Sequence, residues 1–218
     1  MEILRMPAAG EDSQFMTDQE VAASVDIAWN NWNSWRDVFE GGPYPANPLL
    51  SNPDRFSTFL TEYSVRRTIR AGTHERFRGT LAAESGSFFG AIQDGTGRAI
   101  DKLDEGLRID YGTLNRWGRV NRITSALSKV AAFVRPERFI AWDKYGKAGV
   151  NRILGHDANF RTYQDYLAKC DDTWRGEAGD RIRAYLTSNG ARDRLVGDLR
   201  FQRRVLDVYL MKQGGREF

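Results

Sequence analysis

The apolar positions of this chain recur mostly at steps of three and four residues, the period of an amphipathic α-helix. The clearest example lies near the N-terminus, where Thr17 and Glu20 have the capping-box spacing that begins a helix. Gly41 and Gly42 are placed to end it. The apolar side chains that share its buried face are Val21, Val25, Ala28, Trp29, Trp32, Trp35 and Phe39.

The next stretch contains several prolines and is predicted to be a loop, because proline cannot continue a helix. These prolines are Pro43, Pro45, Pro48 and Pro53. A second helix is predicted from Asp54 to Gly72. Its candidate core residues are Phe56, Phe59, Leu60, Tyr63 and Ile69. Residues 73–118 are rich in glycine, which predicts short helices joined by turns.

Five further helices are predicted in the second half of the chain. They cover residues 123–134, ended by Pro136, and then residues 143–155, 163–168, 180–187 and 195–210. No strict alternation of apolar and polar residues persists, so a sheet of any size is not expected. We therefore predict an all-α fold in which residues 17–218 form a single compact multi-helix domain, preceded by a loose tail over residues 1–16.

Composition narrows the class of protein. No apolar run approaches the roughly 20 residues of a membrane-spanning helix, and the N-terminus does not read as a secretory signal. We therefore expect a cytoplasmic protein with no membrane partner. Cys170 is the single cysteine and there are two histidines, so neither an internal disulfide nor a usual zinc site is expected. No metal and no other cofactor is predicted.

Charge indicates an anionic partner. The net charge is only +3, but the calculated isoelectric point is about 9.1, and basic residues are concentrated in the middle of the chain. Between residues 108 and 138 the acids are Asp110 and Glu137 alone, whereas the basic residues are Arg108, Arg116, Arg119, Arg122, Lys129, Arg135 and Arg138. This distribution is consistent with binding to nucleic acid.

Two residues in this region are candidates for chemistry. Asp143 follows an apolar run and precedes a predicted helix, where its carboxylate would accept the first free backbone N–H groups. Lys129 lies on the preceding helix. A helical wheel places Arg122, Ser125 and Lys129 on a polar stripe roughly 120° from the apolar face, so Lys129 is expected to point out of the core. That apolar face consists of Ile123, Leu127, Val130 and Val134.

The order of residues over 117–155 resembles that of the helix-hairpin-helix DNA glycosylase superfamily, in particular proteins with the 8-oxoguanine DNA glycosylase fold. A proline, a hydrophobic pair and an aspartate that begins a helix carry the resemblance. The matching residues are Pro136, Phe139, Ile140 and Asp143, followed by Val150, Arg152 and Leu154. The resemblance implies that DNA is the partner and that the protein excises a modified or damaged base.

The resemblance also implies roles for individual residues. Asp143 would stabilise positive charge on the sugar, and Lys129 would be the amine nucleophile of an enzyme that also cleaves the strand. The residues expected to hold phosphates around the mouth of the site are Arg119, Arg122, Lys144 and Lys147.

The sequence departs from the family in two respects. The leucine-proline-glycine hairpin is missing, although Gly112 and Gly118 flank a possible replacement, and Lys129 is closer to Asp143 than in typical bifunctional members. A second hypothesis is therefore a non-catalytic helical module that binds nucleic acid or protein within a bacterial repair or defence assembly. A third is a protein-interaction domain that uses the Trp-rich first helix. Under the second and third hypotheses, Asp143 is only a helix cap and Lys129 is an ordinary solvated residue.

Overall fold

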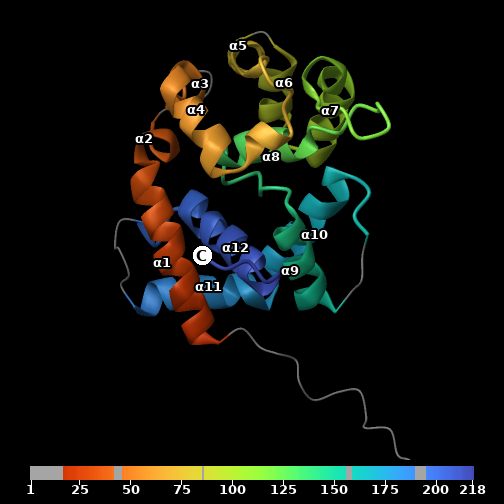
Figure 1. Ribbon diagram of the computed structural model, residues 1–218. Coiled ribbons are helices and arrows are strands. Elements are labelled where there is room, and N and C mark those ends of the chain that lie inside the picture. Colours follow the sequence, from red (N-terminus) through yellow and green to blue (C-terminus); the bar gives the residue numbers. More distant parts are fainter. Residues whose placement is uncertain (1–16, 42–45, 85, 156–158, 190–194) are drawn as a thin grey trace, which may run out of the picture.

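The computed structural model describes residues 17–41, 46–84, 86–155, 159–189 and 195–218, and these residues form helices joined by turns (Figure 1). The predicted tail, residues 1–16, lies outside the described residues. The longer helices are α1 (Asp18–Ser34), α4 (Pro53–Glu62), α5 (His74–Ala82), α6 (Ser87–Asp94), α7 (Gly97–Tyr111), α8 (Thr124–Val134), α9 (Lys144–Leu154), α10 (Tyr163–Arg175), α11 (Glu177–Ser188) and α12 (Leu199–Gln213). The shorter ones are α2 (Arg36–Phe39), α3 (Pro48–Ser51) and the 3-10 turn η1 (Val65–Arg67).

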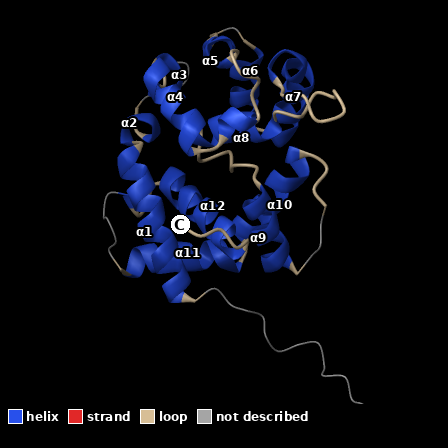
Figure 2. Cartoon of the chain, viewed as in Figure 1, coloured by secondary structure: helices blue, strands red, loops and turns tan. Residues whose placement is uncertain are grey.

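No strand occurs among the described residues, as Figure 2 shows. The backbone pairs in β geometry only at two isolated bridges, Ile69 with Gly112 and Leu114 with Val120. The described helices bury one continuous apolar cluster. The predictions of an all-α fold and one compact domain are therefore confirmed, whereas the finer resemblance to the glycosylase fold stays a prediction.

The first helix begins as predicted. Thr17 accepts a hydrogen bond from the backbone N–H of Glu20, and the Glu20 carboxylate accepts one from the backbone N–H of Thr17. Helical geometry is interrupted at Trp35, so the expected single helix is divided into α1 and α2. Trp32 and Trp35 are fully buried and Trp29 packs partly against the core. All three tryptophans therefore pack in or against the interior.

The prediction of a loop across the prolines is wrong at two of them. Pro48 and Pro53 stand at the starts of α3 and α4, where Asn47 and Asn52 cap the helices through their side chains. A proline is tolerated there because its missing N–H would have no partner within the helix. Pro43 and Pro45 lie outside the described residues.

The second helix ends earlier than predicted, at Glu62 rather than near Gly72. Ser64 adopts a left-handed conformation with φ of 56°, which stops the helix before η1. Ile69 is still buried, but it reaches the core from the segment after η1. This early ending leaves the backbone carbonyl of Tyr63 exposed to the side chain of another helix.

The middle and final helices follow the prediction in part. α5 and α6 are short as expected, but α7 runs for 15 residues although Gly106 lies in its interior. α8 and α9 match closely, and Gly155 ends α9 in a left-handed conformation. α10 and α11 are longer than predicted. The last helix starts only at Leu199, which is 45% exposed.

α12 lies at the centre of the lower half of the molecule in Figure 1, where α1 and α9 pack against it. The contact with α9 is a contact of backbones. A Cβ atom on Gly149 would lie 1.9 Å from the carbonyl oxygen of Leu210, and one on Gly214 would lie 1.9 Å from that of Tyr145. The first turn of α9 is therefore held directly against the last turns of α12.

This contact predicts that Gly149→Ala destabilises the protein by about 1–3 kcal/mol, because the added methyl group forces the two helices apart. Urea unfolding followed by circular dichroism measures the change. Gly106→Ala in α7 is the matched control, since nothing lies within 4 Å of its added Cβ. This control should gain about 0.5–1 kcal/mol from its higher helix propensity. Equal stabilities of the two variants would contradict the prediction.

Candidate active site

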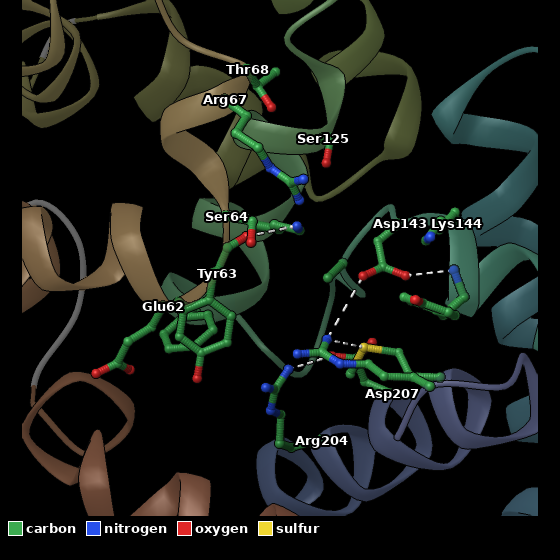
Figure 3. Close-up of a pocket in the computed structure, with 16 residues that line it drawn as sticks. Glu62, Tyr63, Ser64, Arg67, Thr68, Ser125, Asp143, Lys144, Arg204 and Asp207 are labelled. Carbon is green, nitrogen blue, oxygen red and sulfur yellow. Dashed lines mark hydrogen bonds and ion pairs between the residues drawn. The ribbon is translucent and has the colours of Figure 1, made fainter. Parts of the chain in front are cut away.

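A pocket of about 500 Å³ lies where the end of α4, α8, the start of α9, α12 and the C-terminal segment meet (Figure 3). Both residues predicted to carry chemistry, Lys129 and Asp143, line it. Ser125, from the same polar stripe as Lys129, lines it too. The fold thus brings together two side chains that the sequence places on different helices.

Asp143 is the N-cap of α9, as predicted. Its Oδ1 accepts hydrogen bonds from the backbone N–H groups of Tyr145 at 2.8 Å and Gly146 at 3.0 Å. Its Oδ2 lies 3.9 Å from Nη1 of Arg216, and the side chain is 14% exposed. One oxygen therefore fixes the carboxylate in place while the other faces a cation in the pocket wall.

Lys129 is half-buried in the wall of this pocket. Its Nζ donates a hydrogen bond to the backbone oxygen of Tyr63 at 2.9 Å, the carbonyl left accessible by the early end of α4. Burial lowers the pKa of Lys129 below its ordinary value. Asp143 is the charged neighbour that opposes this most strongly. The amine is thus more easily deprotonated than a surface lysine, and it lies within electrostatic reach of the carboxylate.

The sequence analysis missed the ion pair of Arg204 and Asp207, which also lines the pocket from α12. Both side chains are buried, and burial raises the pKa of Asp207 to about 6, although Arg204 opposes this. Oδ1 of Asp207 has no hydrogen-bond partner among the described residues. A sequence signal for Arg204 and Asp207 does exist, because these charged residues stand within an apolar run around Val205 and Val208.

The lining carries more positive than negative charge. Arginine and lysine contribute Arg67, Lys129, Lys144, Arg204 and Arg216, whereas the acids are Glu62, Asp143 and Asp207. Aromatic walls come from Tyr63, Phe133 and Tyr145. The pocket can therefore accept a ligand that combines a flat ring with a negatively charged group.

Only one of the four predicted phosphate-binding residues lines this pocket. Lys144 does so. Lys147 is outside the lining, with its Nζ 4.7 Å from the ring centroid of Trp142, and burial lowers the pKa of Lys147. Arg119 is exposed on the loop that follows α7. Any role of these three residues in binding DNA stays a prediction.

Arg122 has structural partners instead. Its guanidinium pairs with Asp101 at 3.1 Å and with Asp104 at 3.0 Å, and it donates a hydrogen bond to the backbone oxygen of Arg161. Asp104 is fully buried and also accepts a hydrogen bond from the backbone N–H of Ile123. Arg122 therefore joins α7 to the start of α8 and to the segment before α10.

No protein-family model, curated protein or solved structure matches this chain. The interpretation of the pocket therefore rests on its own geometry. Among the residues that the structure describes, no group of three or more histidine, cysteine or acidic side chains could hold a metal ion. None of the described helices has the length and apolar character needed to span a bilayer.

The partners of Arg122 predict that Arg122→Gln destabilises the protein by about 2 kcal/mol, because buried Asp104 loses a charged hydrogen-bond donor. Arg119→Gln is the matched control, since this exposed side chain has no ion-pair partner among the described residues. Its stability should stay within about 0.5 kcal/mol of the wild type. Chemical denaturation of the three proteins measures the effect, and an unchanged Arg122→Gln protein would contradict the structural role.

The raised pKa of Asp207 predicts that this residue makes the stability of the fold depend on pH. Its pKa rises from the ordinary 3.8 to about 6 on folding. Between these values the folded chain retains a proton that the unfolded chain has released, so this group makes stability fall as pH rises from about 4 to about 6. Through this group the free energy of unfolding of the wild type should fall by on the order of 2 kcal/mol between pH 4 and pH 7. Asp207→Asn should not show this fall, and urea unfolding of both proteins at the two pH values measures it.

Asp198 provides a control of opposite sign. Burial alone would raise its pKa, but hydrogen bonds from Arg200 and from the backbone hold the pKa of Asp198 below its ordinary value. Its contribution to stability is therefore lost as pH falls. Asp198→Asn should alter the pH profile in the direction opposite to Asp207→Asn. Identical profiles for wild type and Asp207→Asn would show that Asp207 does not retain its proton on folding.

Proposed function

We propose that this protein binds DNA and excises a modified or damaged base in the pocket described above. The observation that carries the proposal is the placement of the Asp143 carboxylate and the Lys129 amine in the lining of one predominantly basic pocket. Each residue alone has an ordinary structural explanation. An ionisable pair that shares a pocket, with one member's pKa lowered by burial, is typical of a catalytic site.

The size and lining of the pocket suit an extruded nucleotide. Its volume of about 500 Å³ falls within the usual range for sites that enclose a small ligand. A base inside a duplex cannot be reached, so an enzyme that acts on it must turn the nucleotide out of the helix into such a pocket. Tyr63 and Tyr145 offer aromatic surface for the base. Arg67, Lys144 and Arg216 offer charge for the flanking phosphates.

Asp143 is suited to stabilising the transition state. Breaking the bond between sugar and base develops positive charge on the sugar, which a nearby carboxylate stabilises. The two N–H groups of α9 hold this carboxylate in a fixed position. Such preorganisation means that the stabilising charge needs little rearrangement when the bond breaks.

Lys129 is suited to nucleophilic attack once its amine is neutral. The nitrogen lone pair would bond to the anomeric carbon while the base leaves with the electrons of the broken bond and takes up a proton. The attached nitrogen then loses one proton, and its lone pair displaces the ring oxygen from the anomeric carbon. The ring oxygen takes up a proton as the sugar ring opens, and a protonated Schiff base results. The lowered pKa of Lys129 increases the fraction of neutral amine available at neutral pH.

The proposal predicts that Lys129→Gln abolishes covalent capture on a duplex with an abasic site in the presence of borohydride, because only a Schiff base is reduced to a stable bond. Lys169→Gln is the matched control. Lys169 is an exposed lysine of α10, paired with Asp172 and outside the pocket lining. Its capture should match that of the wild type. Capture of Lys129→Gln at the wild-type level would exclude Lys129 as the nucleophile.

A panel of duplexes carrying oxidised, alkylated and hypermodified bases tests excision itself. Asp143→Asn should slow release of the preferred base by roughly 100-fold or more. Asparagine is also a favourable N-cap, so the helix start is preserved while the charge is removed. Normal turnover by this variant would exclude the proposed role of the carboxylate.

The hydrogen bond from Lys129 to Tyr63 and the buried pair of Arg204 and Asp207 support a second candidate, a DNA-binding module without excision. In that case both pairs only stabilise the fold. Steeply salt-dependent affinity for DNA, with neither base release nor capture by borohydride, distinguishes this function from a glycosylase.

A further inference from the structure

The loop after α7 projects from the body of the molecule as a short, ordered hairpin (Figure 1). The backbone N–H of Asn121 donates to the carbonyl of Thr113 at 2.8 Å, and that of Asn115 donates to the carbonyl of Arg119 at 2.9 Å. The side-chain oxygen of Asn115 accepts from the N–H groups of Trp117 and Arg119. Hydrogen bonds therefore fix the shape of the hairpin through to its tip.

The hairpin tip exposes apolar side chains to solvent. Trp117 is 69% exposed and Leu114 is 61% exposed. The guanidinium carbon of Arg116 lies 3.9 Å from the ring centroid of Trp117, which covers one face of the indole and leaves the other open. The remaining tryptophans among the described residues pack partly or wholly against the core. Two exposed large apolar side chains on one short ordered hairpin are the kind of apolar surface that marks an interaction site.

The charge of the hairpin indicates the kind of partner. Residues 112–121 contain Arg116 and Arg119 and no acidic residue. Neither arginine forms an ion pair with another residue that the structure describes. Two unneutralised guanidinium groups beside an exposed aromatic ring match a chain of phosphates that carries flat bases.

We propose that this hairpin binds single-stranded nucleic acid, with one base stacked on the open face of Trp117 and the adjoining phosphates held by Arg116 and Arg119. An unpaired base fits because Arg116 leaves only one face of the indole free. Insertion between two base pairs would require both faces. The surface lies outside the pocket lining, so this site goes beyond the proposed excision and stands or fails independently of it.

Single-stranded oligo(dT) with a fluorescent label is the probe, and fluorescence anisotropy measures its affinity over a range of salt concentrations. Trp117→Ala should weaken binding roughly 5- to 150-fold, the loss expected for one stacked base. Trp117→Phe should recover most of the affinity, since phenylalanine also presents a flat aromatic face. Arg116→Gln should instead lower the slope of log affinity against log salt by about 0.7, the value for one lost phosphate contact on a single strand.

Two control variants match these changes elsewhere on the surface. Leu199→Ala removes an exposed apolar side chain from the start of α12, and Arg175→Gln removes an exposed charge from α10. Both should bind oligo(dT) as the wild type does. Circular dichroism establishes that each variant is folded, which separates loss of binding from loss of structure.

The same experiment can overturn the proposal. Failure of the wild type to bind oligo(dT), or wild-type affinity in Trp117→Ala, would exclude this surface as a single-strand site. Tighter binding to a blunt duplex than to oligo(dT), with equal dependence on Trp117, would also exclude it. Oligo(dT) affinity tests the hairpin, whereas base release and borohydride capture test the excision pocket, so failure of the hairpin proposal and failure of the excision proposal give different results.

Discussion

The backbone contact between α9 and α12 joins the two walls of the pocket that carry Asp143 and Asp207. Gly149 and Gly214 leave room for the carbonyl oxygens of Leu210 and Tyr145, so the two helices meet without intervening side chains. This close approach sets the start of α9, with Asp143 as its cap, against the segment of α12 that carries Asp207. A side chain at either glycine would move one carboxylate relative to the other. The geometry of the pocket therefore depends on the absence of two Cβ atoms.

The electrostatics of the pocket follow from burial on that scaffold. Removing an amine or a carboxylate from water disfavours its charged form, which lowers the pKa of Lys129 and raises that of Asp207. Arg204 compensates Asp207, and Asp143 compensates Lys129, but neither fully cancels the effect of burial. A buried amine with a lowered pKa and a buried carboxylate with a raised pKa both reduce the stability of the folded protein at neutral pH. Each also gains or loses its proton closer to physiological pH. That combination is typical of sites that perform chemistry.

The basic residues of the chain divide into two kinds that a count of charges cannot separate. Arg122 joins α7, the start of α8 and the segment before α10 through Asp101, Asp104 and the carbonyl of Arg161, so its charge is used within the fold. Arg116 and Arg119 lie on the hairpin with no acidic partner among the described residues. The two kinds stand within a few positions of one another in sequence. Only Arg122 lies close enough to the acids of α7, Asp101 and Asp104, to pair with them.

The sequence by itself determined the all-helical class and the cap of α9 at Asp143, because these depend on local periodicity and capping. The predicted polar stripe held only in part, since Arg122 precedes α8 and Lys129 is half-buried instead of pointing into solvent. The predicted elements differ from the structure at the early end of α4 before Ser64 and at the helix starts at Pro48 and Pro53, where asparagine caps are a local signal that the loop prediction passed over. Only the tertiary structure placed Lys129 and Asp143 in the lining of one pocket and added Arg204 and Asp207 to it. Helix period reports which face of a helix is apolar, whereas the partner of a polar face is set by packing between helices far apart in the chain.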